Sequence, residues 1–168
     1  TPAEESNWER TTSSQEVIDF LKVVAEHSAG RIILDTTTFA TEAGTPISYM
    51  IISDVAPAST ADVPEDKGVV YVNCNIHSGE IEGKESMMIF AREVAQGKHD
   101  DLLKDLVVII VPNSNPDGND NLGKNRITTQ FTPKLVGTRA EGNGLNVNRD
   151  MTKLETACGR TIVKLMND

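Results

Sequence analysis

The chain is short of cysteine, of aromatic residues and of positive charge, and two of these shortages exclude particular classes of protein. Its 168 residues include only two cysteines, Cys74 and Cys158, so neither a disulfide framework nor a cysteine-rich zinc site is available. With 16 lysines and arginines against 25 aspartates and glutamates, the formal net charge is -9. That balance argues against a nucleic-acid partner or an anionic membrane surface. No apolar run approaches the length of a membrane span.

What remains is typical of a single α/β domain, with 38% hydrophobic and 24% charged residues. Ser13 and Glu16 have the spacing of a capping box, and apolar residues then recur at helical intervals up to Gly30. The β-rich segments 32–38 and 47–53 are separated by a short turn-forming stretch, which predicts two adjacent antiparallel strands at an edge of the sheet.

A second group of segments predicts the middle of the sheet. Val69–Val72 is a β-branched and aromatic run that reads as a buried central strand, and Leu106–Val111 reads as a second buried strand. A helix from about Glu80 to Gln96 lies between them, so a right-handed crossover should join two parallel strands. The predicted fold is α/β, with a mixed, largely parallel central sheet flanked by helices. Ligands of such sheets bind beyond the carboxyl ends of the strands.

His77 and Glu80 follow the first of these strands and are three residues apart. A tight loop that leaves the strand and opens a helix could aim both side chains at one point. An imidazole nitrogen and a carboxylate oxygen are ligands that a catalytic zinc accepts, with room for a third protein ligand and a water. The alternative is an ordinary loop histidine followed by a glutamate that the helix dipole favours.

After Pro112 comes a long segment rich in Asn, Gly and Pro, which inside a compact domain should be functional or disordered. It contains NPDG at 115–118 and LNVNRD at 145–150, and both follow HSGE at 77–80. With these three motifs in this order and spacing, the sequence resembles the zinc carboxypeptidases, the group of carboxypeptidases A, B, D, E and N.

The resemblance implies a role for each matching residue. His77 and Glu80 would bind one zinc ion, and Asn148 with Arg149 would hold the C-terminal carboxylate of a peptide. Arg139, in the segment GTR, matches the arginine that polarises the scissile carbonyl. The chemistry agrees, because a planar carboxylate suits the forked donor of an arginine, and a positive charge can stabilise a developing oxyanion. Arg126 is the competing candidate for the role of Arg139.

The chain also departs from the family's pattern. Asn146 stands where the family commonly has an aspartate that orients the first zinc histidine, so it would accept a hydrogen bond from His77 without supplying charge. The family's third zinc ligand and its general-base glutamate come later than Asp168. Of the other histidines, His27 has no ligand spacing around it, and His99 falls past the far end of the helix that Glu80 opens. Residues 1–168 are therefore expected to be the N-terminal part of one catalytic domain, incomplete at the C-terminus.

Such a piece should expose an apolar strand edge around Leu106–Val111, which the missing half or a second copy would cover. The final segment, 154–166, reads as a helix that would pack on strands outside the chain. The start at Thr1 without methionine slightly favours a secreted or periplasmic protein, and the compartment is otherwise not fixed. A zinc deacylase or amidase of the succinylglutamate desuccinylase and aspartoacylase type, acting on small acyl-amino acids, is an alternative function. A non-catalytic peptide-binding module is another.

Overall fold

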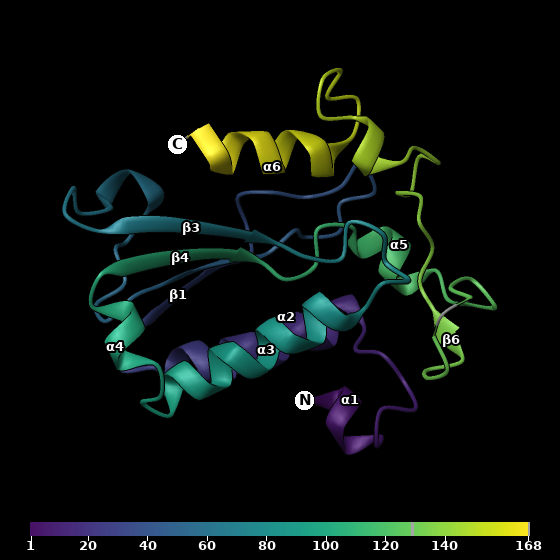
Figure 1. Ribbon diagram of the computed structural model, residues 1–168. Helices are drawn as coiled ribbons and strands as arrows, with labels where there is room; N and C mark the ends of the chain where they lie inside the picture. The colour runs from purple at the N-terminus through teal and green to yellow at the C-terminus, as the bar shows by residue number, and fades with distance from the viewer. Residues whose placement is uncertain (129, 168) are drawn as a thin grey trace.

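The computed structural model describes residues 1–128 and 130–167, which form a mixed sheet between helices (Figure 1). The α-helices are α1 (Pro2–Glu5), α2 (Ser14–Glu26), α3 (Glu82–Ala95), α4 (Asp100–Leu103), α5 (Pro116–Asp120) and α6 (Ala157–Asn167), and two 3-10 turns are η1 (Thr60–Asp62) and η2 (Val147–Arg149). The strands are β1 (Ile32–Asp35), β2 (Tyr49–Ile52), β3 (Gly68–Asn73), β4 (Leu106–Val111), β5 (Gly123–Lys124) and β6 (Leu135–Val136).

The main sheet has the strand order β1-β2-β4-β3, and β5 pairs with β6 in a separate hairpin-like sheet. The mixed sheet flanked by helices is thus confirmed. The expectation of a largely parallel sheet was wrong for these strands, because β3 and β4 form the only parallel pair described. The crossover through α3 accounts for that pair, whereas the short link from β1 to β2 suits antiparallel strands.

Strand β3 was expected to be central, but in the described sheet it is the outermost strand next to β4. Val69 is 55% exposed and Val70 is 40% exposed, whereas five of the six residues of β4 are buried. A β-branched run does not distinguish an edge strand from a central one, because both favour the same side chains. At the other edge, β1 is outermost and β2 lies inside the sheet.

Helices cover both faces of the sheet (Figure 1). The larger core packs α2 and α3 against one face, with Leu21, Met88 and Ile110 at its centre. Helix α6 covers the other face and packs through Ile162 against residues that include Ile47. This corrects the expectation for 154–166, because the helix finds its apolar partners within the chain itself.

The sequence signals for the ends of α2 and α3 are confirmed. Ser13 and Glu16 form the expected capping box at the start of α2, with the Glu16 carboxylate accepting from the Ser13 backbone at 2.9 Å. Beyond the end of α3, Gly97 has φ +82°, a conformation that favours glycine. In the described part of the chain, no helix combines the length and the apolar character that crossing a bilayer requires.

Candidate metal centre

The loop between β3 and α3 is narrow and folded back on itself. The Glu80 N–H donates to the His77 carbonyl at 2.8 Å, which places the two side chains on the same side of a turn. At Gly79 a Cβ atom would lie only 2.8 Å from the side chain of Ile127, so this position has no room for a larger residue. The loop is also fixed from outside, because the Ser78 N–H donates to the Thr138 carbonyl at 3.2 Å.

His77 and Glu80 are brought together as expected, with 3.2 Å between His77 Nδ1 and Glu80 Oε1. Two ligands of a tetrahedral zinc, each about 2.05 Å from the metal, are roughly 3.3 Å apart. The observed separation therefore matches that of two ligands that share a zinc ion. Of the two side chains, that of His77 is 9% exposed and that of Glu80 is 52% exposed, so the pair opens to solvent from the glutamate side.

The second ring nitrogen of His77 has two polar neighbours. Asn146 Oδ1 lies 3.1 Å from Nε2, and Arg139 Nη1 lies 3.0 Å from the same atom. Only one of these two hydrogen bonds can form at a time, because Asn146 Oδ1 needs a proton on Nε2 and the guanidinium needs a lone pair there. A metal on Nδ1 requires the proton to be on Nε2, and Asn146 is then the acceptor that holds the ring.

The two candidate arginines differ in what they contact. Arg139 reaches His77 and also lies 3.6 Å from Glu80 through its Nη2 atom. Arg126 instead bonds to the backbone and the side chain of Asn121. Gly137 allows the segment that carries Arg139 to approach the loop of His77 and Glu80 closely. A Cβ at Gly137 would lie 2.6 Å from the Ser78 carbonyl. Of the two, only Arg139 is recorded in contact with the His77–Glu80 pair.

Asn148 and Arg149 lie in η2, the 3-10 turn whose N-cap is Asn146. The Asn148 N–H donates to Asn146 Oδ1 at 3.0 Å, so the oxygen that faces His77 also starts this turn. Arg149 is exposed, and its recorded hydrogen bond goes to the carbonyl of Asn148 at 2.9 Å. The structure thus links the η2 turn to the loop of His77 and Glu80 through Asn146.

The loop that carries these residues is anchored at both ends to the start of α6. Glu141, which is buried, accepts from the N–H of Cys158 at 3.1 Å, and burial raises the pKa of its carboxyl group. At the other end, Asp150 accepts from the backbone N–H groups of Glu155 at 2.9 Å and Thr156 at 2.7 Å. Burial opposes the charge of Asp150, but these donors hold its pKa below the usual value.

No third His, Cys, Asp or Glu joins His77 and Glu80 within the described residues. His27 caps α2, where its ring contacts the carbonyl of Val23, and His99 pairs with Glu93 at 2.9 Å. Both histidines are therefore engaged elsewhere, as the sequence indicated.

One set of buried residues near the loop was missed from the sequence. Lys84 and Glu85, at the start of α3, are 0% and 2% exposed and lie in a network of buried polar groups. A signal was present, because Lys84 precedes Met88 and Ala91 at helical spacing and so shares their buried face.

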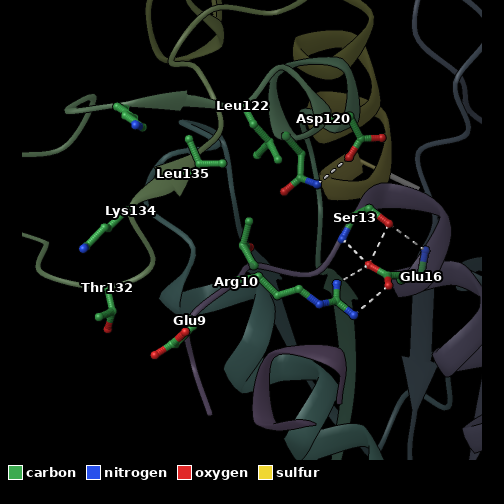
Figure 2. Close-up of a pocket in the computed structure, with 12 residues that line it drawn as sticks. Glu9, Arg10, Ser13, Glu16, Asp120, Leu122, Thr132, Lys134 and Leu135 are labelled. Carbon is green, nitrogen blue, oxygen red and sulfur yellow. Dashed lines mark hydrogen bonds and ion pairs between the residues drawn. The ribbon is translucent and has the colours of Figure 1, made fainter. Parts of the chain in front are cut away.

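A cavity of about 570 Å³ lies apart from the His77–Glu80 pair, neither of which lines it. It lies between the segment before α2 and the hairpin of β5 and β6, where Leu122 and Leu135 form an apolar wall (Figure 2). Arg10 reaches across one side and is paired with Glu16 at 2.9 Å (Figure 2). Glu9, Thr11, Ser13, Asn119, Asp120, Lys124, Thr132 and Lys134 complete the lining.

Comparison with known proteins identifies the family of the chain. The family model described as zinc carboxypeptidase matches residues 19–160, and the chain therefore belongs to the zinc carboxypeptidase family. Members of this family are metallopeptidases that act as carboxypeptidase hydrolases. No curated protein matches the chain.

Several solved structures share the fold. A metallo-carboxypeptidase from Burkholderia cenocepacia matches with a TM-score of 0.64 and 20% identity, over 92% of this chain and 37% of that one. A metallo-carboxypeptidase from Pseudomonas aeruginosa has a TM-score of 0.56 and 17% identity, over 85% and 34%. The carboxypeptidase A from Helicoverpa armigera has a TM-score of 0.53 and 22% identity, over 66% and 26%. The chain thus spans between 26% and 37% of the length of these three relatives.

Proposed function

We propose that the whole protein removes C-terminal residues from peptides by zinc-dependent hydrolysis. The observation that carries this proposal is the pairing of His77 Nδ1 with Glu80 Oε1 at 3.2 Å, with Asn146 Oδ1 placed to accept a hydrogen bond from the other ring nitrogen. A bound zinc would supply a Lewis acid that polarises a carbonyl oxygen and lowers the pKa of a water molecule. His77 and Glu80 would hold it.

Three further side chains of the chain would act on the substrate. Arg139, next to the His77–Glu80 pair, would donate to the carbonyl oxygen as negative charge develops on it. Arg149 and Asn148 would bind the terminal carboxylate, which would restrict the enzyme to the last residue of a peptide. Within the described residues, the hydrogen bond of the exposed Arg149 guanidinium goes to a backbone carbonyl and no ion pair of Arg149 is seen. The guanidinium could therefore turn to a substrate carboxylate without breaking an ion pair there.

We also infer that the third zinc ligand and the general base come from sequence outside these residues. In the described chain, no further metal-binding side chain joins the pair, and catalytic zinc sites normally use three protein ligands. The chain also spans only about a third of the length of its solved relatives. The 168 residues would then form the N-terminal part of a larger catalytic domain, with little activity by themselves.

Kinetics on the full-length protein test the proposal. Arg149→Ala should mainly raise KM for a peptide with a free C-terminus, because it removes a contact that is made before the reaction begins. Arg139→Ala should mainly lower kcat, because its interaction strengthens in the transition state. Lys153→Ala, an exposed cation close to the same loop, is the matched control and should leave both constants unchanged.

Four results would refute the proposal. Equal hydrolysis of a peptide and its C-terminal amide would exclude an exopeptidase. Turnover of small acyl-amino acids without turnover of peptides would identify a deacylase. A full-length protein that binds peptide but no zinc would be a binding module, and retention of stoichiometric zinc by His77→Ala would remove the metal assignment.

A further inference from the structure

Two charged residues with no part in the proposed chemistry lie inside the protein. Lys84 is 0% exposed and Glu85 is 2% exposed. Lysine and glutamate are almost never fully buried unless they are paired, so this placement needs a reason. Both belong to the first turn of α3, the helix that follows the loop with His77 and Glu80.

Lys84 uses all three of its ammonium protons within this buried network. It donates to Thr11 Oγ1 at 2.7 Å, to Asn119 Oδ1 at 2.6 Å and to the backbone carbonyl of Thr12. The Glu85 carboxylate accepts from the hydroxyls of Thr11 and Thr12 and from the Thr12 N–H at 2.8 Å. Burial lowers the pKa of Lys84 to about 8, against the opposing effect of Glu85, so the ammonium is mostly charged at pH 7.

The ammonium group holds the Asn119 amide in place together with two groups that only accept, the Thr12 carbonyl and the Asp120 carboxylate. A lysine ammonium can only donate, so the Asn119 atom that faces it must be the carbonyl oxygen. The Asn119 NH₂ group then faces the other way and donates to the Thr12 carbonyl at 3.1 Å and to Asp120 at 2.8 Å. Asn119 Oδ1 is therefore a fixed acceptor for the side chain of Asn75.

Asn75 is the first residue of the turn that leads to His77. Its NH₂ group donates to Asn119 Oδ1 at 3.1 Å and to Asn113 Oδ1 at 2.8 Å. Its own Oδ1 is buried without a recorded partner, so the NH₂ group alone anchors this side chain. Asn75 also has φ +59°, a left-handed conformation that residues other than glycine, asparagine and aspartate rarely adopt. The two hydrogen bonds of the Asn75 NH₂ group hold the backbone in this conformation.

We propose that Lys84 is a positioning residue for the metal centre, acting through Asn119 and Asn75 on the turn that orients His77. Without the ammonium, Asn119 Oδ1 loses the donor that lies 2.6 Å from it, and the Asn119 side chain is free to shift away from Asn75, which then loses an acceptor. The turn is then free to relax, and His77 Nδ1 no longer stays beside Glu80. This inference rests on the proposed zinc site.

Zinc affinity of the full-length protein, measured by competition with a chromophoric chelator, tests the proposal. Lys84→Met keeps the buried stem and removes the donors, and Asn75→Gly keeps the left-handed turn accessible while removing the amide. Each should weaken zinc binding about tenfold, as is typical for groups that support metal ligands. Lys104→Met, at an exposed lysine, is the control and should leave zinc affinity unchanged.

The double variant separates positioning from general destabilisation. If Lys84 acts through Asn75, Lys84→Met combined with Asn75→Gly should bind zinc about tenfold more weakly than the unaltered protein, and not about a hundredfold as independent effects would give. Independent effects, or a folded Lys84→Met protein with unaltered zinc affinity, would overturn the inference. Thermal unfolding shows which variants are folded.

Asn119→Ala gives a second route if Lys84→Met does not fold, because it removes the acceptor that Lys84 and Asn75 share. It should also weaken zinc binding about tenfold, and unaltered affinity would overturn the inference. An unaltered protein that binds no zinc would instead refute the proposed function. The two failures are thus distinguishable.

Discussion

Asn146 offers a quantitative test of the metal centre, because Asn146→Asp adds one negative charge with almost no change of shape. The Asn148 N–H that donates to Asn146 Oδ1 at 3.0 Å can donate equally to a carboxylate. The contact of Oδ1 with His77 Nε2 at 3.1 Å would become a charge-assisted hydrogen bond. The variant should therefore bind zinc more tightly than the unaltered protein.

The size of the gain follows from the geometry. From Asn146 Oδ1 across the ring to a zinc on Nδ1, the path is roughly 7 Å, taking a Zn–N bond of about 2.0 Å. A single negative charge and a zinc of charge +2 at that distance attract each other by about 1.2 kcal/mol in water and about 2.4 kcal/mol at half that dielectric constant. The centre is half open to solvent, so we expect about 1–2 kcal/mol, or roughly 5- to 30-fold tighter binding.

Competition titration with a chelator on the full-length protein measures this gain. Asn143→Asp is the matched control, because it places the same charge in the same loop on an exposed residue whose recorded side-chain bond goes to the Leu145 N–H. Asn143→Asp should raise zinc affinity less than Asn146→Asp does, and added salt should reduce that gain further because the new charge is exposed. Unchanged or weaker zinc binding by Asn146→Asp would show that this oxygen does not face the metal-bound ring.

Three further predictions concern the stability and the edges of the fold. Met88→Ala should lower the free energy of unfolding by about 2–5 kcal/mol in a denaturant titration, because Met88 is 0% exposed at the centre of the larger core. The lowered pKa of Asp150 means that its contribution to stability is present above the usual pKa of an aspartate and is lost as the pH falls through the folded value. In acid titrations of the unfolding free energy, Asp150→Asn should remove that loss, and an unchanged acid profile would contradict the assignment. The 168-residue chain alone should self-associate through the exposed edge of β3 in size-exclusion chromatography, and Val70→Lys should reduce the association.

The elements that the sequence predicted well are those whose signals are local. Each of these signals depends only on residues within its own segment. They are the capping box at Ser13, the apolar spacing of α3 and the fully apolar run of β4. The position of β3 could not be read in this way, because the order of strands depends on which segments meet in space. The separation of His77 and Glu80 by one tight turn was also a local property, which is why this pair could be proposed before its geometry was known.

The remaining parts of the candidate site depend on contacts between distant segments. Nothing local to Asn75 shows that its amide meets Asn119, 44 positions further along the chain, or that Lys84 fixes that amide from a third segment. A buried amide chain of this kind has one low-energy arrangement, because each reversal would set two oxygens or two NH₂ groups against each other. The loop of His77 and Glu80 thus receives its orientation from groups outside the candidate ligand pair. A sequence motif that records only the ligands identifies the chemistry of the site and omits the network that holds its geometry.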